Sequence, residues 1–212
     1  MDSIFSDMLN DDPLLAGCLN EIIRAYDTLL QCVRDGGKIL ICGNGGSAAD
    51  SEHIVGELMK GFRQSRPLPD DLRDEFVELY GEEGTYLADH LQGAIPAISL
   101  VSHTALITAF LNDVDASMIF AQQVLGYGKA GDCLIAISTS GNAANVVRAV
   151  EVAHVLGVRS IGMTNSHGGR LKEMCEVCIC APATETAKAQ QHHEVIYHAL
   201  CSAVEAAIFP LK

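Results

Sequence analysis

Five short apolar runs that alternate with segments of helical periodicity constrain the fold of this chain more than any other feature. They occupy residues 38–42, 97–101, 133–137, 160–163 and 177–180. Consecutive apolar residues are typical of strands buried on both faces, and strands that alternate with helices form parallel sheets because the helices supply the crossovers. The sequence therefore predicts the α/β class: a three-layer α/β/α sandwich, doubly wound, around a central, mostly parallel sheet.

The helical segments cover residues 12–34, 46–62, 103–111, 116–127, 142–156, 169–174 and 186–208. The first and the last are long, and the first ends at Gly36 and Gly37, since glycine commonly terminates helices. A chain of 212 residues, of which 49% are hydrophobic, can fill one sizeable core. We therefore expect one domain over residues 1–212, with long helices near both ends.

Residues 63–95 interrupt this rhythm. Leu72, Phe76 and Leu79 have helical spacing, which predicts an amphipathic helix that begins near Pro69 and ends at Gly81. Residues 70–83 contain seven acidic residues and one arginine, so −6 of the formal net charge of −13 lies there. We interpret the segment as a helical excursion from the domain. A solvated, charged helix is the simplest interpretation, and a lid or a subunit contact is the alternative.

The acidic composition excludes several classes of partner. The chain has 14 Lys and Arg against 27 Asp and Glu, whereas nucleic acids and anionic membranes are bound by basic surfaces. We find no apolar run of the roughly 20 residues that span a membrane, and the first residues do not resemble a signal peptide. The eight cysteines fall among apolar positions, where cysteine acts as a small hydrophobic residue. We expect a cytoplasmic protein that binds neither nucleic acid nor membrane.

Two loops rich in glycine and small hydroxyl residues follow two of the predicted strands. The first, residues 43–47, reads Gly-Asn-Gly-Gly-Ser, and the second, residues 138–142, reads Ser-Thr-Ser-Gly-Asn. Each leads directly into a helix, whose free N–H groups and positive dipole end attract an anion. Neither loop matches a dinucleotide-binding or P-loop motif. Together they predict a phosphate-binding cradle at the carboxyl edge of the sheet.

Two helices carry residues that could bind a metal ion or transfer protons. His53 and Glu57 are four residues apart and so share one helix face, although a surface pair of this kind is common without any function. In the last helix, His198 lies four residues after Glu194 and eight after Gln190, a distance of about 12 Å along a helix axis. Spacing alone does not decide whether Glu194 or Gln190 is the partner of His198.

Four of these motifs, taken together, resemble the sugar isomerase (SIS) domain family, most closely its phosphoheptose isomerase branch. They are Gly43-Asn44-Gly45-Gly46-Ser47-Ala48-Ala49-Asp50-x-x-His53-x-x-x-Glu57-Leu58, Asn112-Asp113, Ile137-Ser138-Thr139-Ser140-Gly141-Asn142, and Gln190 with His198. The similarity covers nearly the whole chain except residues 63–95.

The resemblance implies a ligand set. One Zn²⁺ or other divalent ion per subunit would be held by His53, Glu57, Gln190 and His198. A small phosphorylated sugar would contact Asn44, Gly45, Gly46, Ser47, Glu57, Asn112, Asp113, Ser138, Thr139, Ser140 and Gln190. Members of this branch are homotetramers whose sites combine neighbouring subunits, so the resemblance also implies a homotetramer here.

The implied reaction is the aldose–ketose isomerisation of sedoheptulose 7-phosphate to D-glycero-D-manno-heptose 7-phosphate. Proton transfer through an enediol needs a base and an acid, for which Glu57 and His198 are the candidates, and a divalent ion would polarise the sugar oxygens. Ala143 and Ala187 replace a serine and an aspartate of the branch, which leaves another ketose phosphate as an alternative substrate.

A non-catalytic SIS protein is the other class of alternative. Some members of the family are scaffolds that associate with the bacterial replication initiator, and others bind a sugar phosphate without turnover. Scaffolds of this kind lose parts of the His, Glu and His set, whereas His53, Glu57 and His198 are all present here. The intact set favours an enzyme.

Overall fold

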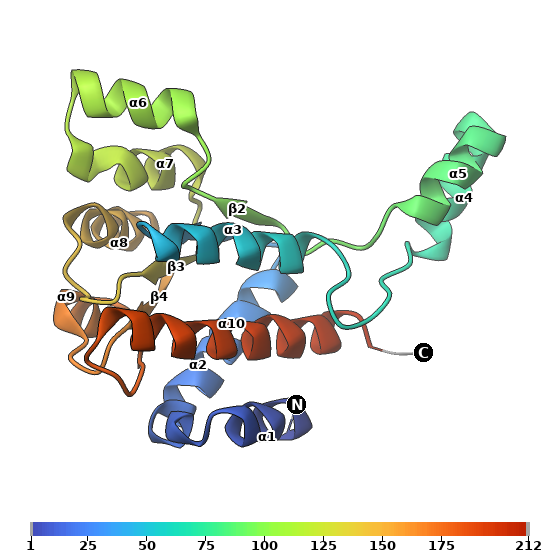
Figure 1. Ribbon diagram of the computed structural model, residues 1–212. Helices are drawn as coiled ribbons and strands as arrows, with labels where there is room; N and C mark the ends of the chain where they lie inside the picture. Colours follow the sequence, from blue (N-terminus) through green and yellow to red (C-terminus); the bar gives the residue numbers. More distant parts are fainter. Residues whose placement is uncertain (1, 211–212) are drawn as a thin grey trace.

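The computed structural model describes residues 2–210, in which five strands form one parallel sheet (Figure 1). The strands are β1 (Ile39–Cys42), β2 (Ala97–Ser99), β3 (Cys133–Ile137), β4 (Arg159–Thr164) and β5 (Val177–Cys180). They lie in the order β2-β1-β3-β4-β5, and each of the pairings is parallel. The predicted parallel sheet is therefore confirmed, with β2 two residues shorter than its apolar run and β4 extended by one residue at each end.

The helices are α1 (Asp2–Asp11), α2 (Leu19–Arg34), α3 (Gly46–Met59), α4 (Asp70–Tyr80), α5 (Glu82–His90), α6 (Thr104–Asp113), α7 (Ile119–Tyr127), α8 (Ala144–Leu156), α9 (Gly169–Met174) and α10 (Thr186–Ile208). Short 3₁₀ turns, Pro13–Cys18 and Ala116–Met118, precede α2 and α7. The sequence pattern did not predict α1, and it merged the first 3₁₀ turn with α2. Among the described helices, none has the length and apolar content that a membrane crossing requires.

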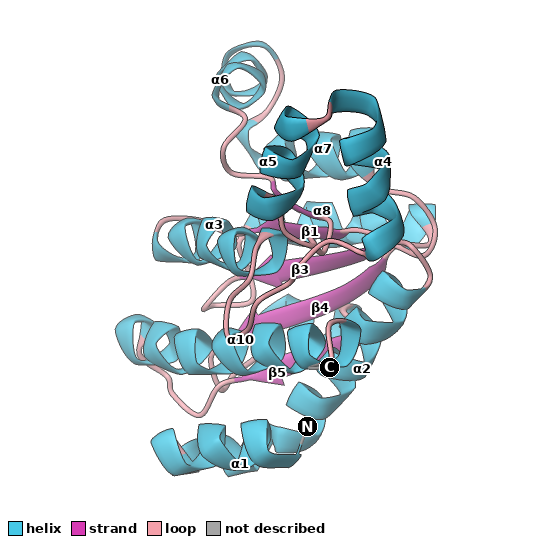
Figure 2. Ribbon diagram, turned by 90° about the vertical axis from the view of Figure 1, so that its right-hand side faces the viewer, coloured by secondary structure: helices cyan, strands magenta, loops and turns pink. Residues whose placement is uncertain are grey.

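Helices cover both faces of the sheet, as the sandwich prediction requires (Figure 2). Side chains alternate across a strand, so Ile39 and Ile41 of β1 face one layer and Leu40 and Cys42 face the other. The first core includes residues of α1, α2, α3 and α10, and the second includes residues of α7, α8 and α9. The three-layer α/β/α architecture is confirmed.

Helices α4 and α5 form a helical hairpin, here called the arm (residues 70–90), that projects from the rest of the molecule (Figure 1). The two helices meet at Gly81, which has a φ of 58°. They cross closely at Gly84, where an added Cβ would lie 1.8 Å from the carbonyl oxygen of Phe76. Helix α4 lies where the sequence predicts a helix, whereas α5 was not predicted because residues 82–90 contain few apolar side chains.

The strand order places the two glycine- and serine-rich loops next to each other. Strand β1 lies between β2 and β3, so the connections that leave β1 and β3 run to opposite sides of the sheet. In open parallel sheets, ligands bind outside the carboxyl ends of the strands at such a point of reversal. The loops after β1 and β3 both end there, and they lead into α3 and α8, which cover opposite faces.

Candidate functional site

The loop after β1 has the backbone of an anion-binding turn. Gly45 has a φ of +57°, a conformation that favours glycine, and α3 begins at the next residue. The N–H groups of Ser47 and Ala48 donate to the carbonyl oxygens of Asn44 and Gly45, so the first turn of α3 closes directly on the loop. The positive end of the helix dipole lies at this loop, where it favours an anion. Asn44, Gly45 and Gly46 are exposed, whereas Ser47 is buried in the first turn of the helix.

The loop after β3 lines the other side of this crevice. Ser138 is buried, Thr139 is half-buried and Ser140 is exposed, and the hydroxyl oxygens of Ser138 and Ser140 are 3.5 Å apart. The side-chain amides of Asn44 and Asn145 bond each other reciprocally, at 2.9 Å in each direction, and so join the first loop to the start of α8, which follows the second loop. The predicted cradle residues of both loops therefore lie together, although their contact with a phosphate stays a prediction.

Gln190 lies beside the same cradle, because a Cβ added at Gly46 would be 2.2 Å from its Nε2 atom. Asn112 and Asp113 lie elsewhere. They are exposed at the end of α6, which packs on α7, and the amide of Asn112 donates a 2.7 Å hydrogen bond to Asp113. The participation of these three residues in sugar binding stays a prediction.

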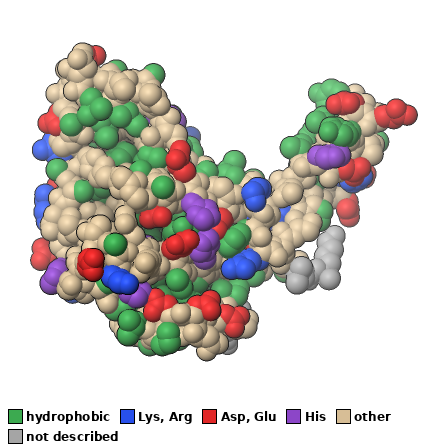
Figure 3. All heavy atoms as spheres, in the orientation of Figure 1, with side chains coloured by type: hydrophobic (Ala, Val, Ile, Leu, Met, Phe, Trp, Pro, Cys, Tyr) green, Lys and Arg blue, Asp and Glu red, His purple; other side chains and the backbone are tan. Residues whose placement is uncertain are grey.

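His53, Glu57 and His198 converge on one point although 141 positions separate Glu57 from His198 in the sequence (198 − 57). Helices α3 and α10 pack against each other, and histidine and acidic side chains gather over them (Figure 3). Ligand atoms of the three residues all lie within 4.8 Å of one another. An Oε1 atom of Glu57 is 2.7 Å from His198 Nδ1 and 3.4 Å from His53 Nε2.

Three polar atoms of this triad are buried without being bonded. Within residues 2–210, both carboxylate oxygens of Glu57 and the Nδ1 atom of His198 have no hydrogen-bond partner of proper geometry, in spite of their close approach. Buried polar atoms are nearly always bonded, so such atoms call for a ligand. Two imidazoles and one carboxylate are the protein ligands of many catalytic zinc sites, which keep a further position open. The residues present fit a divalent metal ion.

Two aromatic residues that the sequence analysis did not single out contact the triad. The hydroxyl of Tyr197 is 2.9 Å from His53 Nδ1, and the ring of Phe62 stacks on His198 with centroids 5.6 Å apart. A hydrogen bond at one imidazole nitrogen fixes which nitrogen is free to bind a metal ion. Tyr197 directly precedes His198 in the sequence, which is the one signal that pointed to it.

Further acidic groups border the triad. Burial and the nearby carboxylate of Glu194 raise the pKa of Asp50 to about 6, although His53 acts in the opposite direction. Glu194 Oε1 lies 3.8 Å from His198 Nε2, so the i, i+4 pair is in contact, whereas Gln190 lies at the cradle. Which of the two joins His198 at a metal ion stays a prediction.

A groove of about 540 Å³ opens beside the triad. It runs between α1 and α10, and its lining includes Met8, Val195, Arg63, Gln64 and His198. The imidazole of His198 and the guanidinium of Arg63 both line this groove. His198 is the member of the triad that this groove reaches.

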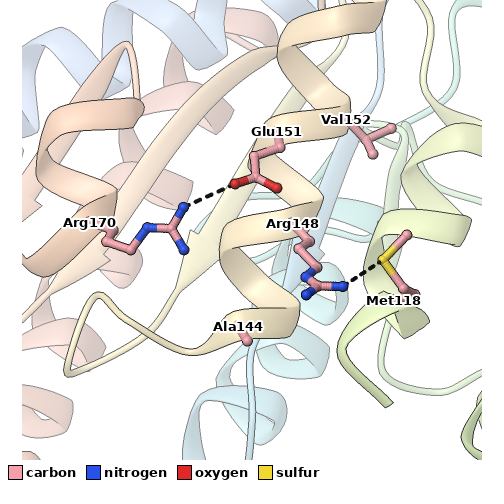
Figure 4. Close-up of a pocket in the computed structure, with 6 residues that line it drawn as sticks. All are labelled: Met118, Ala144, Arg148, Glu151, Val152 and Arg170. Atoms are coloured by element: carbon pink, nitrogen blue, oxygen red, sulfur yellow. Dashed lines mark hydrogen bonds and ion pairs between the residues drawn. The ribbon is translucent and has the colours of Figure 1, made fainter. Parts of the chain in front are cut away.

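A second pocket, of about 350 Å³, lies along α8 (Figure 4). Arg170 pairs with Glu151 at 3.0 Å, and Arg148 donates to the sulfur of Met118 at 3.4 Å. Both arginines therefore already have partners. The residues that line this pocket differ from the sequence-predicted site residues, and we do not assign it to the site.

The cradle and the triad lie at different points along α3. From Gly46, His53 is seven residues and Glu57 eleven residues further on, which corresponds to about 10 and 16 Å along the helix axis. One ligand reaches both only if it is elongated, with its anionic group several bonds away from its other end.

Comparison with known proteins identifies a family. The SIS domain family matches residues 97–209 and, through a second description of the same domain, residues 16–74. The chain is 38% identical to the phosphoheptose isomerase of Rhodospirillum rubrum, over 92% of this chain and 89% of that protein. It is also 38% identical to the phosphoheptose isomerase of Thiobacillus denitrificans, over 87% and 82% of the two chains.

Solved structures agree with the sequence comparison. A phosphoheptose isomerase from Neisseria gonorrhoeae superposes with a TM-score of 0.72 at 31% identity, over 96% of each chain. One from Francisella tularensis superposes with a TM-score of 0.75 at 29% identity, over 96% of this chain and 95% of that one. The likeness therefore covers nearly the whole chain.

Proposed function

Because the chain belongs to the SIS domain family, in its phosphoheptose isomerase branch, we propose that it isomerises sedoheptulose 7-phosphate to D-glycero-D-manno-heptose 7-phosphate. The observation that carries the proposal is the convergence of His53, Glu57 and His198 within 4.8 Å. The first two lie on α3, which begins at the proposed phosphate cradle, and the third lies on α10. A scaffold that only binds partners has no need of unbonded buried carboxylate oxygens. The arrangement supports an enzyme.

Glu57 and His198 divide the proton transfers. Glu57 takes a proton from C1 of the ketose, the electron pair forms the C1=C2 bond, and the C2 oxygen takes a proton from His198. The enediol then loses its O1 proton to His198 as the C1=O bond forms, and Glu57 returns its proton to C2. Both groups end in the state in which they began, as catalysis requires.

His53, Glu57, Gln190 and His198 are the residues that would hold a Zn²⁺ ion in this proposal. A bound divalent ion supplies Lewis-acid polarisation of the carbonyl and hydroxyl oxygens. Both oxygens of Glu57 are unbonded within the described chain, so this carboxylate has one oxygen for a cation and one for a proton. His53 and Gln190 are the residues of the set with no proton-transfer role.

The distance between cradle and triad favours a long sugar phosphate. The loops after β1 and β3 would bind the phosphate with N–H and hydroxyl donors, while C1 and C2 lie about 10–16 Å further along α3. In a 7-phosphate of a seven-carbon ketose, the phosphate and the reacting carbons are at opposite ends. The heptose phosphate therefore comes nearer to spanning this distance than shorter ketose phosphates do, which supports the heptose.

We further propose a cytoplasmic homotetramer. Every residue of α6 is at least partly exposed, although the helix is apolar. Leu111 is 51% exposed, and Val114, the residue after the helix, is 64% exposed. Such a surface supports burial against another subunit. Burial of Cys42, Cys133 and Cys201 raises the pKa of each thiol, so these cysteines are structural, which suits a reducing compartment.

Incubation with a panel of C5 to C7 ketose phosphates tests the proposed substrate. We expect turnover of sedoheptulose 7-phosphate, detected by NMR of the products, and much slower turnover of pentulose and hexulose phosphates. Preferred turnover of a shorter ketose phosphate would replace the substrate but keep the reaction. Tight binding of the heptose phosphate without product would instead favour a binding protein.

A further inference from the structure

Arg66 is fully buried directly beyond the helix that carries Glu57. Its residue exposure is 1%, and its Nη1 and Nη2 atoms donate to the carbonyl oxygens of Leu58 and Glu57 at 2.6 and 3.0 Å. These carbonyls belong to the last turn of α3, where intrahelical partners are lacking and a cation complements the helix dipole. Arg66 therefore fixes the backbone from which Glu57 projects.

The remaining nitrogen of Arg66 bonds to Glu205 of α10. The distance from Nε to Glu205 Oε1 is 2.7 Å, and both side chains are at most 1% exposed. The Glu205 carboxylate also accepts the backbone N–H groups of Phe62 and Arg63, each at 2.8 Å. The pair is thus buried, charged and bonded at each of its nitrogens and oxygens.

Glu205 connects this ion pair to His198 in two ways. It lies seven residues, or two helical turns, after His198 on the same helix and so on the same face. It also holds the backbone of Phe62, whose ring stacks on the His198 imidazole with an interplanar angle of 21°. The network therefore reaches Glu57 through the backbone carbonyls at the end of α3, and it reaches His198 through the ring of Phe62.

We propose that Arg66 and Glu205 are positioning residues that align Glu57 with His198 for proton transfer, an inference that rests on the proposed function. Neither residue belongs to the triad. A buried ion pair contributes little stability compared with a well-packed apolar pair, but its directional bonds fix geometry. Alignment matters here because a displacement of about 1 Å between reacting groups can cost about 100-fold in rate.

Replacing both partners tests the proposal, because an apolar pair removes the bonds without leaving a buried charge. In the double variant R66M/E205M we expect a folded protein whose kcat falls by about tenfold or more while KM stays within about twofold. The split arises because the double variant leaves the proposed phosphate cradle untouched. Wild-type kcat in the folded double variant would overturn the proposal, as would a kcat loss that merely follows the folded fraction.

A second pair of variants decides the matter if the double variant does not fold. Phe62→Leu leaves the ion pair intact but removes the ring on His198, so kcat should fall by about threefold or more at constant KM. Phe62→Tyr keeps the ring and should retain wild-type kcat. Equal kcat values for the two Phe62 variants would contradict the proposed link to His198.

Lys38 and Asp132 provide the control, since they form another ion pair, at 2.5 Å, between the residues that directly precede β1 and β3. Lys38→Met should lower the melting temperature but not the kcat of the folded protein. A crystal structure of R66M/E205M adds a readout without activity: we expect the Phe62 ring to leave His198. Absent isomerisation in the wild type would refute the proposed function, whereas an unmoved Phe62 would refute the positioning role.

Discussion

At the residue scale, the chemistry depends on Glu57, whose buried carboxylate lies 2.7 Å from His198 and 3.4 Å from His53. Its surroundings are two imidazoles and a buried helix end, and the part of the chain that the structure describes offers its oxygens no hydrogen-bond donor of proper geometry. A carboxylate in this state is available to a proton or a cation.

Glu57→Gln removes the base while keeping the shape of the side chain. We expect kcat to fall by about 100-fold or more, because general base catalysis contributes factors of this order. Binding of the sugar phosphate, measured by calorimetry, should persist because the cradle lies elsewhere on α3. Glu78→Gln, on the arm, is the control, and turnover by Glu57→Gln at the control's rate would rule out the base.

Tyr197 supports His53 through the 2.9 Å contact between its hydroxyl and Nδ1. With Nδ1–H donating to this hydroxyl, the lone pair of Nε2 is free for a metal ion, and such supporting contacts are worth 10- to 100-fold in metal affinity. Tyr197→Phe should therefore weaken Zn²⁺ binding by about tenfold in a competition with a chromophoric chelator. Tyr86→Phe, on the arm, should leave the affinity unchanged, and an equal affinity of both variants would contradict the role.

Asp50 predicts a pH dependence of stability. Because burial raises the pKa of Asp50 to about 6 in the folded state, the folded protein holds this proton more tightly than the unfolded chain. The stability that Asp50 contributes is thus present below its unfolded pKa and is lost as pH rises through about 6. We expect Asp50→Asn and the wild type, both in the presence of a chelator, to have equal melting temperatures near pH 4. At pH 7.5 the variant should melt a few degrees higher than the wild type, and a difference that stays constant with pH would contradict this.

At the element scale, α3 and α10 bring the site together. The helices follow β1 and β5 and pack on the same face of the sheet, and their contact places His53 beside Tyr197, 144 residues away. The Arg66–Glu205 pair then joins the end of α3 to α10. The arm, in contrast, is anchored to the body at its base and packs mainly within itself, α4 on α5.

Gly84 tests the independence of the arm. A side chain at this position collides with the Phe76 backbone, since even a Cβ would lie 1.8 Å from its carbonyl oxygen. Gly84→Val should separate α4 from α5, and hydrogen exchange should accelerate over residues 70–90 while the protection of the β-strands stays unchanged. Ala88, which is also buried in α5, offers the milder variant Ala88→Gly. Loss of protection in the strands would show that the arm stabilises the body.

At the scale of the whole molecule, the sequence predicted the sandwich because consecutive apolar residues such as Ile39 to Cys42 leave a strand no exposed face. It also predicted the loops, whose glycines mark the turns before α3 and α8. It missed α5, which lacks a strong apolar period, and it did not find Phe62 or Tyr197 because their roles follow from the packing of distant helices. Glu205, a charge within the apolar end of α10, was the visible signal of the buried ion pair.

Incorporation of solvent deuterium into the carbon-bound positions of the substrate tests most directly the central claim, which is proton transfer by Glu57. The protein is incubated with sedoheptulose 7-phosphate in D₂O, and ¹H NMR follows C1 of the ketose and C2 of the aldose. Proton transfer through an enediol predicts deuterium at both positions in the wild type and at neither in Glu57→Gln. A wild-type protein that binds the sugar phosphate but yields neither deuterium incorporation nor aldose would contradict the account.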